Sequence, residues 1–390
     1  MGDSLRNSAV IVGVGESEIG KVPHMTGLGL NAQAAKRAIE DAGLRPADID
    51  GLFTAYSFTE PYFMLGSVLA EYLGLKPNLC ASIVVGGASP AAMIGHAAAA
   101  IAAGRARAIL ICAGENRATG LSRDQAVSAL AAVGHPYFEA PYGAFIPSLY
   151  GLVANRYMHE YGITSEQMAA VAVQSRRHAA LHPNAHMRTP IEVSDVLAAK
   201  RISDPLGVLD CCLISDAGGA IVVAHPDLAK DQRKAPAWLF GLGEHHTHEH
   251  LIAAPSLTEF GASVSSKIAY DMAGVSPDDV DFAELYDCFS IVPIIEAEEV
   301  GLCGRGEAGL HFAEGHAAFD AKLPINTHGG MLSHAHAGAA GGLFGVIEAV
   351  RQLRGECGAR QVAKRDLALI HSEGGIMSSH CTLLLGRDRR

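Results

Sequence analysis

Residues 36–50, KRAIEDAGLRPADID, and residues 267–281, KIAYDMAGVSPDDVD, are two versions of one stretch of sequence, 231 positions apart. Seven of the 15 aligned positions are identical, without a gap. Each copy has the pattern of a helix that ends at a glycine, followed by a Pro–Asp turn that leads into a strand. The repeat predicts a duplicated α/β unit, with one copy in each half of the chain. Two unrelated units with similar turn residues are the alternative.

Short apolar runs that end at glycine alternate with alanine-rich stretches along the rest of the chain. Residues 9–15 and 106–114 are predicted strands, and residues 30–43 are predicted to form a helix that ends at Gly43. Such alternation of strands and helices is typical of an α/β fold.

The length of the chain, 390 residues, exceeds the usual size of a single hydrophobic core. We expect two domains, residues 1–228 and 236–390, with the polar stretch 225–238 as the join. A segment of the first domain, about 115–210, contains aromatic clusters and a helix that Thr164 can cap. An insertion of this size with helices of its own usually forms a substrate or partner surface.

The composition excludes several classes of function. The net charge is −11 and no block of Lys or Arg stands out, which argues against a nucleic-acid partner. No run of 18 apolar residues is present, so a membrane span is not expected. The eight cysteines form no C-x-x-C pair and lie mostly in apolar runs, as in proteins of a reducing compartment. Because a signal-peptide pattern is not evident, we expect a cytoplasmic location.

Several longer motifs follow the order in which they occur in a known family. They are residues 156–185 with 201–220, then ELYDCFSIVPI (284–294), NTHGGMLSHAHAGAAGG (326–342) and HSEGGIMSSHCTLLLG (371–386). In these motifs the chain resembles the thiolase superfamily, in the branch of sterol-carrier-protein-type thiolases. The resemblance implies an α/β thiolase fold, in which duplicated βαβαβαββ halves form a five-layered αβαβα core with a loop-domain insertion. It also implies a coenzyme A thioester as substrate, with no other cofactor.

The nucleophilic cysteine of thiolases is missing from its expected position. That cysteine begins a C-A-S-G motif at the start of a buried helix, where the helix dipole lowers the thiol pKa. The matching helix here begins with Gly87 to Pro90, and Gly104 ends it 17 residues after Gly87, as in the family. Cys80 also begins a C-A-S triplet, but it lies seven residues earlier in a predicted strand and lacks an activating helix N-terminus. Ser89 is interpreted as a capping residue.

Other positions of the family's site also hold different residues. The second thiolase cysteine, which moves the proton of the substrate α-carbon, aligns with His371, or with Ser372 if the loop shifts by one residue. His336 stands at the histidine of the family's G-H-P motif, and Tyr286 replaces the His or Asn that holds the oxyanion water. The resemblance places the other oxyanion-hole and helix-N-terminal positions at Gly87, Ala88, Asp287, Asn326, Gly374 and Gly375.

These replacements favour retro-aldol cleavage over Claisen chemistry. Claisen cleavage needs a thiolate to accept the acyl fragment, whereas retro-aldol cleavage needs a base for the β-hydroxyl proton and an oxyanion hole for the enolate. The chain resembles thiolase-like aldolases of steroid side-chain degradation, which lack the cysteines and carry a tyrosine at the position of Tyr286. We expect Tyr286 or His336 to remove the proton and His371 to protonate the enolate. Because the pKa of a free tyrosine is near 10, Tyr286 needs a neighbouring acceptor such as His336.

Two other functions stay open: a Claisen acyltransferase that works on a partner-delivered thioester, and a non-catalytic lipid-carrier or scaffolding subunit. The resemblance further implies a homodimer and a small zinc-ribbon/OB-fold partner protein. No metal site is expected, because the run GEHHTHEH (243–250) is interpreted as a solvated loop near the substrate. The G-x-G of residues 13–15 is interpreted as a strand-to-loop turn, not as a dinucleotide motif.

Overall fold

The computed structural model describes residues 5–229 and 234–389. The strands are β1 (Val10–Glu16), β2 (Gly51–Thr54), β3 (Leu79–Ser82), β4 (Ala108–Asn116), β5 (Arg201–Ser203), β6 (Leu206–Gly207), β7 (Asp216–Ala224), β8 (Ala237–His246), β9 (Phe282–Leu285), β10 (Leu367–Gly374) and β11 (Ser379–Gly386). The α-helices are α1 (Gly27–Asp41), α2 (Leu65–Tyr72), α3 (Ser89–Ala102), α4 (Arg117–Gly120), α5 (Arg123–Ala131), α6 (Ile146–Tyr161), α7 (Ser165–Leu181), α8 (Val193–Ala198), α9 (Ala262–Ala273), α10 (Val292–Glu299), α11 (Ala308–Ala313) and α12 (Ala340–Arg354).

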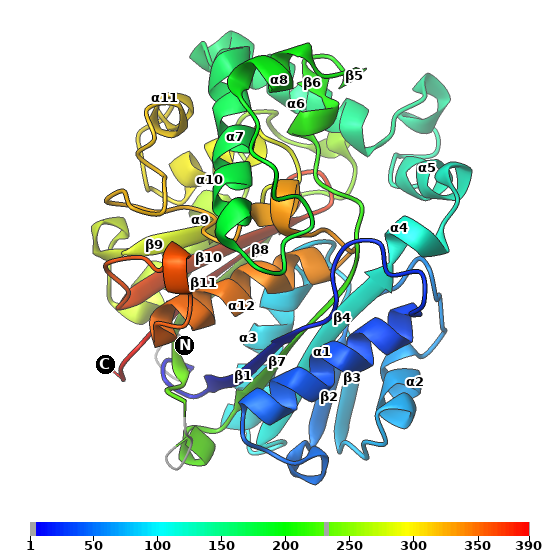
Figure 1. The fold of residues 1–390 in the computed structure, drawn as a ribbon, viewed down its shortest axis with the longest axis vertical. Helices are drawn as coiled ribbons and strands as arrows, with labels where there is room; N and C mark the ends of the chain where they lie inside the picture. The colour runs from blue at the N-terminus through cyan, green and yellow to red at the C-terminus, as the bar shows by residue number, and fades with distance from the viewer. Residues whose placement is uncertain (1–4, 230–233, 390) are drawn as a thin grey trace.

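Two half-sheets make up the main sheet, whose strand order is β3-β2-β4-β7-β1-β8-β11-β10-β9. The half-sheets meet where Val10 and Ile11 of β1 pair with Trp238 and Ala237 of β8. Helices α3 and α12 lie between the half-sheets, α1 and α2 cover the outer face of the first, and α9 and α10 cover that of the second (Figure 1). This is the five-layered arrangement that the resemblance implies, and it confirms the predicted fold class.

Side chains that alternate along a strand reach different layers of this arrangement. On β1, Val10 and Val12 pack in the core under α1, whereas Ile11 packs in the central core with α3 and α12. Gly13 lets α1 approach the strand, because a Cβ atom there would lie 2.1 Å from the carbonyl oxygen of Ala38. The first glycine of the G-x-G pattern therefore serves helix-on-strand packing.

The two copies of the repeat have the same local structure. Helices α1 and α9 are followed by Gly43 and Gly274, with φ angles of 63° and 66° in the left-handed region that favours glycine. A short 3-10 turn follows each glycine, at Pro46–Asp48 and Pro277–Asp279, and leads into β2 and β9. This match supports duplication over two unrelated units.

The insertion carries α4 to α8 and the β5–β6 hairpin, and it packs on the second half of the chain. Thr164 caps α7 as predicted, since its hydroxyl accepts a hydrogen bond from the Gln167 amide at 3.3 Å. Tyr150 and Tyr157 of α6 share a core cluster with Phe289, which follows β9. Helix α6 therefore reaches the carboxyl end of β9.

No helix among the described residues is long and apolar enough to cross a membrane. Residues 230–233, in the middle of the predicted join 225–238, lie outside the described residues. On either side of them are a 3-10 turn at Pro226–Ala229 and the start of β8.

Candidate active site

The N-terminus of α3 is shaped by the loop that precedes it. Ser89, the first residue of the helix, is fully buried, and its hydroxyl donates to the carbonyl of Gly86 at 2.7 Å and accepts from the amide of Val85 at 3.0 Å. The N-cap is Ala88, which makes no side-chain cap bond. The sequence predicted that Ser89 caps the helix, and this prediction was wrong because Ser89 lies one residue inside it. Its hydroxyl instead holds the preceding loop.

Tyr286 fills the space beside Gly87. A Cβ atom on Gly87 would lie 2.1 Å from the hydroxyl oxygen of Tyr286 and 2.6 Å from the carbonyl oxygen of Glu373. Real Cβ atoms do not approach other atoms so closely, so a side chain at position 87 requires the tyrosine to move. The place where the family has a cysteine side chain is therefore occupied here by a phenol.

The side chain of Tyr286 is buried at the carboxyl end of β9. Its backbone N–H donates to Oε2 of Glu296 at 2.8 Å, which anchors the residue after the strand. Burial raises the pKa of Tyr286 well above its usual value, and the neighbouring Cys288 and Glu373 raise it further. Tyr286 is consequently a neutral phenol at pH 7 unless a proton acceptor assists it.

His336 contacts Cys212, which lies just after the insertion in the sequence. Its Nδ1 lies 3.1 Å from Sγ of Cys212, and its backbone N–H donates to Oγ of Ser215 at 3.3 Å. Burial and the positive charge of Arg117 lower the pKa of His336 to about 3. A histidine with this pKa is neutral at pH 7 and a weak proton acceptor.

Asp287 and Asn326 shape loops of the site. The Asp287 carboxylate accepts from the amide of Met331 at 2.6 Å, and burial raises its pKa to about 7. Oδ1 of Asn326 accepts from the amide of Leu285 at 2.7 Å. A Cβ atom on Gly330 would lie 1.9 Å from Oδ2 of Asp287, so that close packing requires glycine.

His371 lies on β10 with both ring nitrogens engaged. Its Nε2 lies 3.1 Å from Nδ1 of His380, and its Nδ1 lies 2.8 Å from the hydroxyl of Thr382. Nε2 of His380 donates to the carbonyl of Met377 at 2.9 Å, because a carbonyl can only accept. Nδ1 of His380 is therefore an acceptor, and the ring proton of His371 on Nε2 is donated to it. Burial lowers the pKa of both histidines.

Gly374 and Gly375 bring the last loop against the start of α3. A Cβ atom on Gly374 would lie 1.9 Å from the carbonyl of Val85, and one on Gly86 would lie 2.7 Å from the backbone of both Gly374 and Gly375. Close contact between glycines thus holds the two loops together. The structure places Gly87, the Tyr286 hydroxyl and the backbone carbonyl of Glu373 around one point.

Glu373 is a site residue that the sequence analysis did not single out. It is buried, and its Oε1 accepts hydrogen bonds from the Tyr150 hydroxyl and, at 3.3 Å, from the Cys288 thiol. Its Oε2 accepts from the amide of Met377 at 3.1 Å. Burial raises the pKa of Glu373 to about 7. The available signal was a charged residue inside the run HSEGGIM, where the family motif has glycine.

The cysteines of the site are thiols. Burial raises the pKa values of Cys212 and Cys288, in each case with nearby acidic groups adding to the effect. Cys80 lies on the edge strand β3, which confirms the predicted strand, and a Cβ atom on Gly66 of α2 would lie 2.9 Å from its sulfur. Burial raises the pKa of Cys80 as well. None of these three has the lowered pKa of an activated nucleophile.

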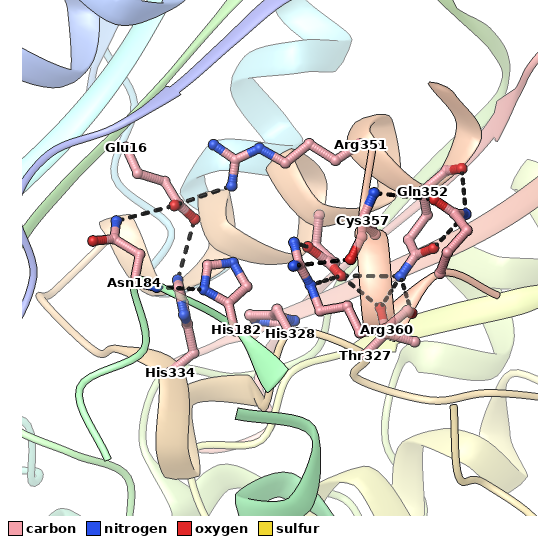
Figure 2. A network of polar contacts seen from close by, with 12 residues as sticks. Glu16, His182, Asn184, Thr327, His328, His334, Arg351, Gln352, Cys357 and Arg360 are labelled. Carbon is pink, nitrogen blue, oxygen red and sulfur yellow. Dashed lines mark hydrogen bonds and ion pairs between the residues drawn. The ribbon is translucent and has the colours of Figure 1, made fainter. Parts of the chain in front are cut away.

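A second cluster of titratable residues, Glu16, His182 and His334, contains the ligand types of a metal site (Figure 2). The backbone N–H of Asn184 donates to Nδ1 of His182 at 3.1 Å, so the proton of the neutral ring is on Nε2. Glu16 already pairs with Arg351 at 3.0 Å and with His334 at 3.1 Å. Although burial alone raises the pKa of Glu16, these partners hold it well below its usual value. The cluster is an ion-paired anchor between β1 and α12.

The histidine-rich run 243–250 is part strand and part loop. Residues up to His246 belong to β8, because they pair with the start of β11. Nε2 of His248 lies 3.1 Å from the carbonyl of Ile376, so this histidine holds the turn after Gly375. The run therefore supports the turn that follows β10, the strand on which Glu373 lies.

Family models match both halves of the chain: "Thiolase, N-terminal domain" over residues 9–200 and "Thiolase C-terminal domain-like" over residues 243–387. The chain belongs to the thiolase superfamily. This thiolase-like chain is 31% identical to the acetyl-CoA acetyltransferase of Methanothermobacter thermautotrophicus, over 95% of the chain and 97% of the relative. It is 32% identical to the steroid side-chain-cleaving aldolase of Thermomonospora curvata, over 99% of both. The solved structure of the Ltp2-ChsH2(DUF35) aldolase superimposes on 99% of both chains, with a TM-score of 0.88 and 32% identity.

Proposed function

We propose that this thiolase-like chain is the subunit of a carbon–carbon lyase that cleaves a β-hydroxyacyl-CoA into a carbonyl product and a shorter acyl-CoA. The observation that carries the proposal is the Tyr286 hydroxyl in the space beside Gly87. Thiolase chemistry transfers an acyl group to a sulfur at this place, whereas a phenol can move a proton but makes a poor acyl acceptor. The likeness to an aldolase over the whole chain supports the same reaction class.

In the proposed reaction, Tyr286 takes the proton of the β-hydroxyl group while its own phenol proton passes to a neighbouring acceptor. The Cα–Cβ bond breaks, the carbonyl product forms, and the bond's electron pair becomes the enolate of the thioester. His336 and the amides at the start of α3 stabilise the enolate oxygen, as preorganised donors do in an oxyanion hole. His371, as the sequence predicts, donates a proton to the enolate carbon. In that role it has to break its hydrogen bond to His380.

The test is product formation by the purified chain, with its partner subunit, from β-hydroxyacyl-CoA substrates that carry steroid, aromatic or short acyl groups. Tyr286→Phe should lower turnover by about 10²–10⁴-fold, the range for loss of general acid–base catalysis. The variant keeps the ring that fills the space beside Gly87, so its fold should match that of the wild type by circular dichroism. A wild-type complex that binds CoA thioesters but releases no carbonyl product would show that the proposal is wrong.

A Claisen acyltransferase is the second candidate, and the contact between Cys212 and His336 favours it. A thiol 3.1 Å from an imidazole is the pairing used by cysteine nucleophiles, although burial raises the pKa of Cys212. Mass spectrometry after incubation with acyl-CoA distinguishes the two reactions. An acyl group on Cys212, absent from Cys212→Ala, supports the acyltransferase, and an unmodified chain with full lyase activity excludes it.

The lyase is further proposed to act as a homodimer with a small zinc-ribbon/OB-fold partner. Strand β3 is an edge strand with every second residue exposed, and large apolar side chains near it, Phe63, Tyr72 and Val84, are also exposed. Such an edge invites pairing with another chain. The similar Ltp2-ChsH2(DUF35) aldolase supports a second subunit. Sedimentation of the chain and of Val84→Glu, with and without the co-expressed partner, tests both contacts.

All eight cysteines are free thiols, which supports a reducing compartment. We therefore keep the cytoplasm as the proposed location.

A further inference from the structure

Glu373 has the surroundings of a group that holds and releases a proton. Three groups contact its carboxylate: the hydroxyl of Tyr150, the thiol of Cys288 and the amide of Met377. In the part of the chain that the structure describes, no Lys or Arg forms an ion pair with it. A buried carboxylate without a cation is costly, so the proton-bound form is stabilised.

Glu373 is also close to the reacting end of Tyr286. Its backbone carbonyl and the Tyr286 hydroxyl would lie 2.6 Å and 2.1 Å from the same Cβ atom on Gly87. The Cys288 thiol, which contacts the Glu373 carboxylate at 3.3 Å, belongs to the residue two positions after Tyr286. Tyr286 and Glu373 are therefore neighbouring buried residues, and the backbone of Glu373 lies beside the Tyr286 hydroxyl.

The proposed reaction requires an acceptor for the Tyr286 proton, because burial raises the pKa of this phenol. His336, the acceptor expected from the sequence, has a pKa lowered to about 3. The pKa of Glu373 is raised to about 7. A proton acceptor works best when its pKa is close to the pH at which the enzyme operates, so Glu373 fits the role better.

We propose that Glu373 is the proton acceptor that allows Tyr286 to act as the base, an assignment that rests on the proposed lyase function. The Tyr286 oxygen takes the β-hydroxyl proton while its own proton passes to the Glu373 carboxylate. After the Cα–Cβ bond breaks, His371 gives its ring proton to the enolate carbon. The proton held on Glu373 then passes to His371, and Glu373 is again a carboxylate. No proton is gained or lost over the cycle.

The protonation of Glu373 can be measured without turnover. Difference infrared spectra of the whole chain between pH 5.5 and 8.5 should show a protonated-carboxyl band that titrates near pH 7. Asp287, whose pKa is also about 7, gives a second band. The band that Glu373→Gln removes identifies Glu373. If this substitution removes no titrating band, the assignment is wrong.

Kinetics then test the role itself. The turnover number of the wild type should rise with pH through about 7, the pKa of Glu373. Glu373→Gln should lower the turnover number by about 10²-fold or more, leave KM nearly unchanged and abolish this rise. Tyr150→Phe should move the rise to higher pH, because the lost hydrogen bond lowers the pKa of Glu373 in the wild type.

Tyr157→Phe is the matched control. Tyr157 lies two turns from Tyr150 on the same helix and donates a hydrogen bond to another buried glutamate, Glu298. Its loss should leave the pH profile unchanged. A wild type without carbonyl product refutes the lyase and this assignment together. A productive wild type whose pH profile persists in Glu373→Gln refutes the assignment alone.

Discussion

Gly87→Ala tests the packing on which the proposed site depends. The new methyl group would lie 2.1 Å and 2.2 Å from the hydroxyl oxygen and the Cζ atom of Tyr286, and 2.6 Å from the backbone oxygen of Glu373. The backbone of Gly87 is not in the left-handed region, so alanine adds no backbone strain there. Any destabilisation therefore comes from the clash.

The expected magnitude is the difference of two terms. A glycine-to-alanine change at a compatible backbone stabilises a protein by about 0.4–1 kcal/mol, because the unfolded chain loses freedom. Overpacking by one methyl group costs about 1–3 kcal/mol. We expect a net loss of about 1–2 kcal/mol in the free energy of unfolding, together with reduced turnover because Tyr286 has to move.

Urea unfolding of Gly87→Ala, Tyr286→Leu and the double variant Gly87→Ala/Tyr286→Leu measures the energy of the clash between the new methyl group and the phenol. Because leucine vacates the space of the phenol ring end, the double variant should be more stable than the sum of the single changes by about 1 kcal/mol or more. Gly95→Ala is the control on the same helix. Its Cβ atom would have only Leu242 nearby, at 3.7 Å, so it should stabilise the protein. Additive effects, or an unaltered Gly87→Ala, would falsify the proposed contact.

Three further outcomes are expected. Arg360→Met removes the guanidinium that pairs with the buried Glu348 at 2.9 Å, and it should lower the free energy of unfolding in urea by about 3–5 kcal/mol. Most of this loss should be recovered when Glu348 is also changed to Gln. Full stability of the single variant would contradict this prediction. Thr164→Ala should lose about 1 kcal/mol through the α7 cap, with KM and turnover unchanged in the same preparation. Burial raises the pKa of Glu373 in the folded state to about 7, so folding holds a proton that the unfolded chain releases, and the stability from this group is lost as pH rises through 7. Thermal unfolding from pH 5 to 8 should therefore show a smaller loss for Glu373→Gln than for the wild type, and parallel curves would argue against the raised pKa.

The motifs predicted which positions form the candidate site, but they did not predict the contacts between the side chains. The motif order places Gly87, Tyr286 and His336 in one site, and the structure brings Gly87 and Tyr286 into contact. Glu373 escaped notice because its neighbours in sequence are small residues that say nothing of burial. Its hydrogen-bond partner Tyr150 lies 223 positions away, on a helix of the insertion.

The sequence by itself determined the helices, turns and strands of the repeated α/β unit. Helices that stop at Gly43 and Gly274, turns at Pro46 and Pro277, and alternating apolar residues act through neighbours along the chain, so they can be read locally. Only the tertiary structure decided which side chains meet. The protonation of Glu373 depends on how far three separate segments exclude water from one carboxylate, and that exclusion exists only after the insertion has packed on the second half of the fold.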